Sequence, residues 1–315
     1  MAQLQIIKEL HIDYMAWRRA TAIGSAVVLL LFLASMVLRG FNLGLDFTGG
    51  TVVEVGYENP TDLGPVTQAL TEAGFSGATV QHFGSRKDVM IRLAPQGDEE
   101  ASAEISDRVF AALSAAADGQ VELRRVEFVG PQVGEELREQ GGLAVLFALI
   151  GVLIYVAVRF EWRFAVGAVA ALIHDVIVTV GVFSILQIPF DLTVLAAVLA
   201  VIGYSLNDTI VIFDRVRENF RRIRKGTVLE IVNRSINETM SRTIITSGTT
   251  LMVVLALFFL GGEIIKGFSL ALILGIGTGT YSTIYIATAI AIWLGVSKAD
   301  LIPVPKEGAE VDARP

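Results

Sequence analysis

The stretch "IGYSLNDTIVIFDRVRENFRRIR" (Ile202 to Arg224) passes from an apolar run into a dense basic cluster. This order is typical of a transmembrane helix whose basic end faces the cytoplasm. Asp208 stands inside the apolar part. An ionised Asp at the middle of a span costs roughly 2.5 to 3.5 kcal/mol on insertion scales, so it normally faces the bundle interior and has a partner or a task. The stretch therefore predicts a helical membrane protein and marks Asp208 as a candidate functional residue.

The whole chain supports a membrane protein. It has 315 residues, of which 53% are hydrophobic and 18% charged. A run of about 20 apolar residues is long enough to cross a bilayer as a helix. Six such runs predict six transmembrane helices, at 20–38, 141–158, 164–186, 192–213, 243–262 and 267–296. The chain has no cysteine and no phosphate-binding G-x-x-x-x-G-K-[ST] loop, so we expect no disulfide, no thiolate metal site and no ATP hydrolysis.

Basic residues predict the orientation of the spans. With the N-terminus inside, the tails 1–19 and 297–315 and the inner connections hold 16 Lys or Arg, eight of them in the loop 214–242. The two short outer loops hold only Lys266. Because short cytoplasmic segments carry an excess of Lys and Arg, both termini are expected in the cytoplasm.

A block of about a hundred residues, 39–140, separates the first two spans and lies outside in this topology. It holds 8 basic and 17 acidic residues, a net charge of −9, which disfavours binding to nucleic acid or anionic lipid. Its periodicity predicts strands at 49–57, 78–83, 87–93 and 121–130, with helices at 61–74, capped by Thr61, and 98–117. The order β-α-β-β-α-β predicts an α+β ferredoxin-like domain. The segment 131–140 is expected to continue as a helix into the second span.

Arg242, at the start of the fifth span, is the expected partner of Asp208, because both lie in the inner half of the bilayer. Hydroxyl groups continue these helix faces at Tyr204, Ser205, Thr246 and Ser247. Burial raises a carboxyl pKa and a nearby guanidinium lowers it, so a pair whose separation changes can act as a proton switch. A fixed pair that only locks two helices fits the same residues, and the sequence leaves both interpretations open.

A second intramembrane acid, Asp175, follows His174 near the centre of the third span. A buried His-Asp pair can satisfy itself and serve only packing, or it can support a proton relay. In the sixth span, Gly275, Gly279 and Ser282 form a small-residue face that permits close helix contact.

Four strings together resemble one family: "FNLGLDFTGGT" after the first span, "ALIHDVIVT" in the third, "GYSLNDTIVIFDRVREN" in the fourth and "SRTIITSGTT" at the fifth. In this order and spacing they resemble SecF, the six-span branch of the SecD/SecF protein-export family within the resistance-nodulation-division superfamily. The resemblance implies a location in the bacterial inner membrane. It also implies that the chain works as half of a SecD-SecF unit.

In that family the unit is thought to associate with the SecYEG channel, with YajC and YidC as further candidate partners. It is thought to use the proton-motive force to draw preproteins outward. The resemblance assigns the proton path to Asp208 and Arg242, and makes Asn207 and Thr209 supporting members of the same motif. It implies no cofactor beyond the coupled protons, no metal site and no enzymatic activity.

The string "LDFTGGT" resembles the family's motif at the base of the external domain. Asp46, Gly49 and Gly50 belong to it, and a tight backbone turn at the two glycines is the expected role.

Three other functions fit parts of the sequence less well. An intramembrane aspartyl protease would use Asp175 and Asp208 as a carboxyl pair, but "LIHDV" and "SLNDT" lack that family's Y-D and G-x-G-D patterns. A small-molecule exporter would need a larger external block and a second half. A structural scaffold for SecD and the channel would not need Asp208.

Overall fold

The computed structural model describes residues 12–95, 99–117, 119–223 and 225–296. The predicted tails 1–19 and 297–315 lie largely or wholly outside these residues. Six helices in the described part are long and apolar enough to cross a membrane, which confirms the six-helix prediction. Five are α1 (Arg18–Leu38), α5 (Pro131–Arg159), α6 (Trp162–Leu186), α7 (Leu192–Arg222) and α8 (Val228–Leu260). The sixth combines α9 (Lys266–Ser282), a π-helical turn η3 (Thr283–Ala287) and α10 (Thr288–Trp293).

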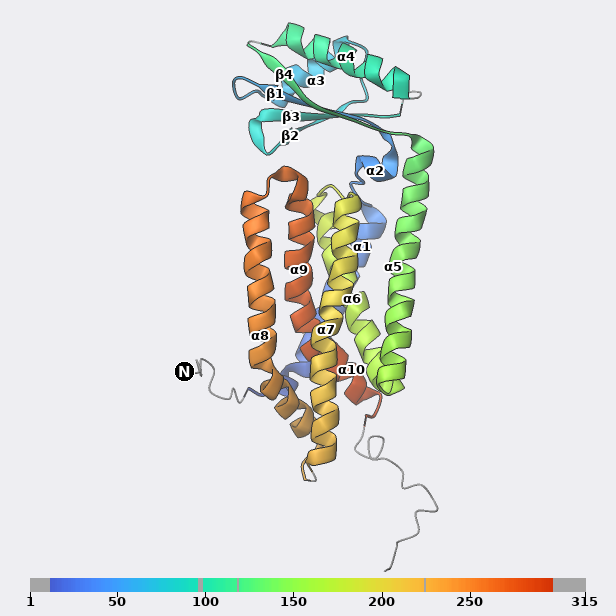
Figure 1. The fold of residues 1–315 in the computed structure, drawn as a ribbon, viewed down its shortest axis with the longest axis vertical. Coiled ribbons are helices and arrows are strands. Elements are labelled where there is room, and N and C mark those ends of the chain that lie inside the picture. The colour runs from blue at the N-terminus through green and yellow to red at the C-terminus, as the bar shows by residue number, and fades with distance from the viewer. Residues whose placement is uncertain (1–11, 96–98, 118, 224, 297–315) are drawn as a thin grey trace, which may run out of the picture.

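The six helices form a bundle with an α+β domain at one end (Figure 1). The most apolar 18-residue segment of α6 is 50% buried inside the protein, and the corresponding segments of α7 and of the last span are 44% buried. In α1, α5 and α8 only 11% of this segment is buried. The helices α6, α7 and α9 therefore form the centre of the bundle. Any group that must be kept from lipid and water is best placed between them.

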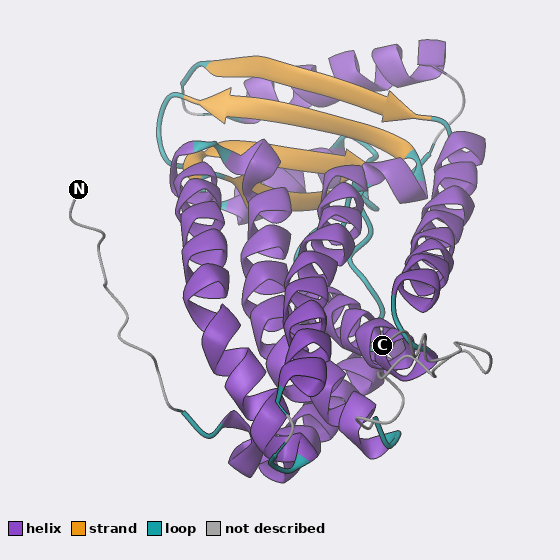
Figure 2. Ribbon diagram, turned by 60° about the horizontal axis from the view of Figure 1, so that its bottom comes forward, coloured by secondary structure: helices purple, strands orange, loops and turns teal. Residues whose placement is uncertain are grey.

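The external domain has the predicted ferredoxin-like plan. Its elements follow as β1 (Gly50–Tyr57), α3 (Leu63–Glu72), β2 (Thr79–Phe83), β3 (Ser85–Leu93), α4 (Glu99–Ala116) and β4 (Val121–Val129). The antiparallel sheet has the order β2-β3-β1-β4. The helices α3 and α4 cover one face, around a core that includes Val53, Leu70 and Ile91. The opposite face of the sheet turns toward the bundle (Figures 1 and 2).

One helix start differs from the prediction. The N-cap residue of α3 is Asp62, not Thr61, and its side chain makes no capping hydrogen bond. The amide of Thr61 donates to the carbonyl of Arg86, and the Asp62 carboxylate pairs with the Arg86 guanidinium at 2.6 Å. The predicted cap is wrong because tertiary contacts with β3 occupy these groups.

The connection 214–242 between the fourth and fifth spans is helical over most of its length, which corrects the expectation of a loop. The helix α7 runs on to Arg222, and α8 begins after a capping box formed by Thr227 and Glu230. Asn219 Nδ2 donates to Ser235 Oγ at 2.9 Å, so the two extensions are held together as a hairpin. Interhelix contacts of this kind make two helical extensions more stable than a solvated loop.

Candidate functional site

Asp208 lies in the centre of the bundle and is only 4% exposed. Its Oδ2 accepts a hydrogen bond from Ser247 Oγ of α8 at 3.3 Å. Ser247 Oγ lies 3.3 Å from Thr280 Oγ1 of α9. A buried carboxylate normally needs such partners. This first polar cluster, Asp208, Ser247 and Thr280, therefore joins α7, α8 and α9.

Arg242 lies on α8 near this cluster, but its side chain is exposed. In the described part of the chain no ion pair joins it to Asp208, although the two charges are close enough for electrostatic attraction. The Thr246 hydroxyl turns back along the helix and donates to the backbone oxygen of Arg242 at 3.0 Å. The pair predicted from the sequence is thus present as two neighbouring charges without a direct bond.

The other predicted residues of the fourth span divide by helix face. Tyr204 donates its hydroxyl to Thr250 of α8 at 3.4 Å, and Thr209 Oγ1 lies 2.9 Å from Thr283 Oγ1 of η3. Asn207 is exposed on the bundle surface and makes none of these contacts. The motif therefore presents Asp208 and Thr209 inward and Asn207 outward.

Asp175 is fully buried and forms a second polar cluster with His174, Ser205 and Ser282. Its Oδ1 lies 3.1 Å from His174 Nδ1. Its Oδ2 accepts hydrogen bonds from Ser205 Oγ of α7 at 2.6 Å and from Ser282 Oγ of α9 at 2.7 Å. The two intramembrane acids share none of these partners, so the geometry does not form the carboxyl pair that an aspartyl protease needs.

Three hydroxyl residues of the last span, Thr280, Ser282 and Thr283, were not predicted as site residues. The available signal was the small-residue face, which predicted close contact with a neighbouring helix. A Cβ added at Gly279 would lie 3.1 Å from the Cβ of Ser205, so α7 and α9 are close enough for hydroxyl contacts. A helix that packs closely on the spans of Asp175 and Asp208 brings its hydroxyls near these acids. The small-residue face and the two acids, considered together, therefore indicate that the hydroxyls belong to the site.

A tight turn with the sequence Gly49-Gly50 connects the short helix α2 (Leu45–Thr48) to β1. Both glycines have positive φ, +67° and +118°, which L side chains rarely adopt. A Cβ at Gly49 would lie 2.8 Å from the Cα of Pro131, and one at Gly50 would overlap the backbone oxygen of Leu93. Asp46 Oδ2 accepts from the first amide of α7, that of Leu192, at 2.9 Å. The motif thus joins the domain to the bundle.

Comparison with known proteins identifies the family. The model described as "Protein export membrane protein SecD/SecF, C-terminal" matches residues 109–297, and "SecD/SecF GG Motif" matches residues 34–61. The protein translocase subunit SecF of Vibrio alginolyticus is 52% identical over 99% of both chains. The chain belongs to the SecF family. The SecF subunits of Pseudomonas aeruginosa, at 52% identity over 96% of this chain and 98% of that one, and of Escherichia coli O157:H7, at 44% over 98% of each, agree with this assignment.

A solved structure shows the same fold. The crystal structure of SecDF, a translocon-associated membrane protein from Thermus thermophilus, is 36% identical with a TM-score of 0.82 over 93% of this chain. A second SecDF structure, in a super-membrane-facing form, is 37% identical with a TM-score of 0.68 over 91% of this chain. The chain spans 39% of the length of each SecDF chain.

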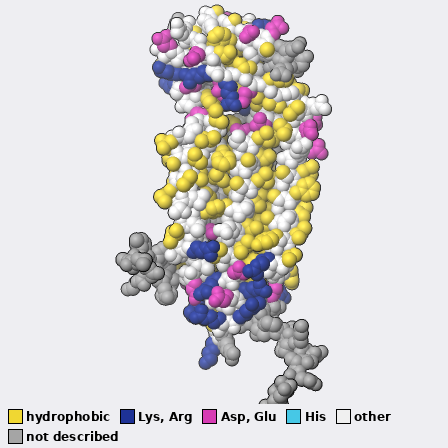
Figure 3. All heavy atoms as spheres, in the orientation of Figure 1, with side chains coloured by type: hydrophobic (Ala, Val, Ile, Leu, Met, Phe, Trp, Pro, Cys, Tyr) yellow, Lys and Arg dark blue, Asp and Glu magenta, His cyan; other side chains and the backbone are white. Residues whose placement is uncertain are grey.

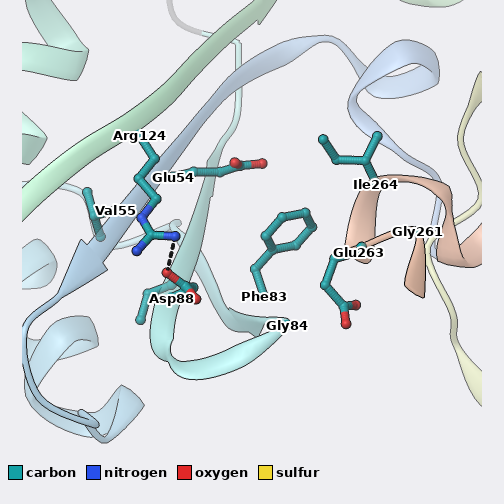
Figure 4. A pocket seen from close by; sticks show the side chains of 11 residues that line it. Glu54, Val55, Phe83, Gly84, Asp88, Arg124, Gly261, Glu263 and Ile264 are labelled. Atoms are coloured by element: carbon teal, nitrogen blue, oxygen red, sulfur yellow. Dashed lines mark ion pairs between the residues drawn. The ribbon is translucent and has the colours of Figure 1, made fainter. Parts of the chain in front are cut away.

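In this SecF-family chain, a cleft separates the uncovered face of the sheet from the end of the bundle that is nearest to it. A cavity of about 280 Å³ lies where the β2–β3 turn, with Phe83 and Gly84, meets Glu263 and Ile264 between α8 and α9 (Figure 4). It continues beside a larger cavity of about 600 Å³. Burial raises the pKa of the Glu54 carboxyl, which lines both, above its usual value. The sequence did not predict this cleft.

The charged side chains of the molecular surface lie mainly at its two ends. A dense group of Lys and Arg lies at the end opposite the external domain, and further basic side chains lie on the domain itself (Figure 3). Several of the dense group are paired: Arg159 with Asp214 at 2.9 Å, and Arg215 and Arg234 with Glu238 at 2.6 and 2.8 Å. The middle of the surface is largely hydrophobic, as expected for a region that contacts lipid.

Proposed function

We propose that this SecF-family chain couples proton flow to protein export through Asp208. The observation that carries the proposal is the placement of Asp208 and Arg242. The carboxylate is buried between three helices, and the guanidinium stands nearby on α8 without a direct bond. Because the opposite charge is near but unbonded, a small movement of α8 changes how strongly it stabilises the ionised carboxylate.

The energy available to such a switch is sufficient. One proton crossing the membrane releases about 2.3 kcal/mol per 100 mV of membrane potential. Two conformations that differ by a few kcal/mol respond to a bias of that size. A proton that binds Asp208 removes the attraction to Arg242, so α8 is free to move relative to α7. The helix α8 ends at the turn that lies under the external sheet, so a movement of α8 can be transmitted to the external domain.

The proposed partner is a SecD subunit. The similar solved chains are described as SecDF, and this chain spans 39% of the length of each. Arg242 and Asn207 are polar side chains exposed on a surface at membrane depth, and such groups avoid lipid. A second helical bundle packed on this face would cover them. We extend the proposal to association with the SecYEG channel, with YajC and YidC as further partners and preproteins as cargo.

The proposed location is the bacterial inner membrane, with both termini in the cytoplasm. The basic end of the molecule supports this orientation, since Lys and Arg are enriched on the cytoplasmic side. The external domain then faces outward. The proposal assigns protons as the coupled ion and gives no residue a catalytic role.

The test uses inverted membrane vesicles that contain this chain with its SecD. Asp208→Asn keeps the size of the side chain and removes its charge, so proton flux and the stimulation of export are expected to fall to background. Asp214→Asn is the matched control and should keep both activities, because Asp214 lies on the same helix with its side chain 42% exposed and paired with Arg159.

Full proton flux and full export stimulation with Asp208→Asn would refute the coupling function. That result would favour the structural-scaffold alternative, in which the chain holds SecD and the channel together without carrying protons.

A further inference from the structure

The second polar cluster holds the most buried acid of the bundle and is not needed for the switch at Asp208. Asp175 is 0% exposed and contacts groups from α6, α7 and α9. Both serine hydroxyls donate to the same oxygen, Oδ2. A carboxylate can accept all of these bonds, whereas a protonated carboxyl must donate one bond of its own. The two protonation states of Asp175 therefore favour different hydrogen bonds.

The hydrogen bond from Ser282 to Asp175 is the one that can break at the lowest cost in free energy. Its Oγ lies 3.2 Å from the backbone oxygen of Gly279, which offers a second acceptor within its own helix. When Asp175 is ionised, Ser282 ties α9 to α6. When Asp175 is protonated, Ser282 can turn to Gly279 without leaving a buried hydroxyl unpaired.

The last span changes its helical geometry at this residue. Ser282 ends α9, and the π-helical turn Thr283–Ala287 follows at once. The first residue of that turn, Thr283, contacts Thr209 of α7. Short π-helical turns occur frequently at functional sites and at bends of helices. The hydrogen bond between Ser282 and Asp175 therefore lies where the last span bends most easily.

A row of aromatic side chains leads from Asp175 to the basic end of the bundle. The ring of His174 lies 5.9 Å from that of Tyr281, Tyr281 lies 5.2 Å from Tyr285, and Tyr285 lies 6.4 Å from Tyr14. Tyr14 belongs to the short 3-10 helix Tyr14–Trp17 that precedes α1. The row therefore reaches the same end of the molecule as the basic side chains.

Hydroxyl groups of α1 and α9 meet along this row. The Tyr281 hydroxyl lies 2.8 Å from Ser25 Oγ and donates to the backbone oxygen of Thr21 at 3.1 Å. The titratable groups nearest to Asp175 are His174 on α6 and Tyr281 on α9. Asp208 lies on α7, about one helical turn beyond Ser205, which donates to Asp175. The basic residues of α1 nearest this row, Arg18 and Arg19, lie at its inner end.

We propose that Asp175 is a second proton-binding carboxylate that exchanges protons with His174, and that the hydroxyl of the neighbouring Tyr281 serves the route from the basic end of the bundle. Protonation of Asp175 releases Ser282 and the π-helical turn of the last span. In the transfer, His174 takes up a proton at Nε2 and gives one up from Nδ1, so an N–H bond breaks as an O–H bond forms at Asp175 Oδ1. The imidazole is then neutral with its proton on Nε2. The reverse transfer restores Nδ1–H and empties the site, so Asp175 acts on the flux by releasing the last span. This inference rests on the proposed proton-coupled function.

The test reconstitutes the chain with its SecD in proteoliposomes and follows proton flux with an internal pH dye. Asp175→Asn keeps the shape of the side chain but cannot bind the proton. Tyr281→Phe keeps the ring and removes only the hydroxyl, and Tyr155→Phe, exposed on α5, is its matched control. Asp175→Asn is expected to lower the flux about tenfold or more, which corresponds to about 1.4 kcal/mol in the barrier. Tyr281→Phe should lower it in the same direction, and Tyr155→Phe should not.

Infrared difference spectra across a pH titration provide a second measurement. The carboxyl band of protonated Asp175 is expected in the unmodified complex and should be absent from Asp175→Asn. Unchanged flux in Asp175→Asn would overturn the inference. So would a loss of flux in Asp175→Asn whose spectra keep the carboxyl band of the unmodified complex, because Asp175 would then have a structural role only. If Asp175→Asn does not assemble, wild-type flux in Tyr281→Phe would overturn it.

Asp208→Asn in the same assay separates the two proposals. Background flux in Asp208→Asn together with full flux in Asp175→Asn removes only the second site. Full flux in Asp208→Asn removes the coupling function itself.

Discussion

Gly50 gives a sharp test of how the external domain is held to the bundle. Alanine at this position would have to adopt φ near +118°, and its Cβ would overlap the backbone oxygen of Leu93 on β3. A sparsely populated backbone conformation costs about 1 to 3 kcal/mol. An overpacked contact costs about another 1 to 3 kcal/mol. We therefore expect Gly50→Ala to destabilise the domain by about 2 to 6 kcal/mol in total, a large part of the stability of a small domain.

Hydrogen exchange measured on the intact chain in lipid nanodiscs reports this loss directly. Since about 1.4 kcal/mol is a factor of ten, amides of β1 that pair with β3 and β4 should exchange roughly 30-fold faster or more. Gly64→Ala is the matched control, because Gly64 lies exposed in α3 with open space around it. There alanine is expected to leave the exchange of the β1 amides unchanged, because its Cβ meets no residue of the sheet. Unchanged exchange of β1 in Gly50→Ala would refute the assignment of this glycine to backbone geometry.

Three further predictions concern other contacts of the chain. Burial raises the pKa of Glu54 from its usual 4.5, so the native domain loses stability as pH rises above about 4.5. Glu54→Gln should therefore raise the unfolding temperature of the domain at pH 7, and the gain should disappear below that pH. Asp46→Ala removes an acceptor at the start of α7 and should cost about 1 kcal/mol, seen as faster exchange of the first α7 amides. Asn233 and Asn237 hold the backbone of Ile12, and replacing both by alanine should expose the segment before α1 to proteolysis, whereas normal protection would contradict the contact.

The membrane architecture could be predicted from local patterns because lipid imposes simple rules. Apolar runs of spanning length predicted six helices, and the structure confirms them. Alternation of apolar residues predicted the strands of the external domain, whose order confirms a ferredoxin-like sheet. The cap at Thr61 failed because the choice between neighbouring capping residues depends on a contact with Arg86, which is distant in sequence.

The candidate site could be predicted only in part. A carboxylate inside an apolar run is costly wherever the helix lies, so Asp175 and Asp208 were identifiable from composition alone. Which hydroxyls bind them depends on how three helices rotate about their axes, and the spacing within one helix does not determine this. Thr280 and Ser282 were therefore missed as site residues, although their helix was expected to pack closely.

The sequence by itself determined the spans, the fold of the external domain and the acids that lipid would not tolerate, because each depends on the chemistry of neighbouring residues. The orientation of the spans stays a prediction. The tertiary structure alone decided that Arg242 stands apart from Asp208 and that Asp175 binds Ser205 and Ser282. It also placed Gly84 of the sheet against Glu263 of the bundle. These contacts arise between segments that are far apart in the chain, so only the packing of helices and sheet brings them together.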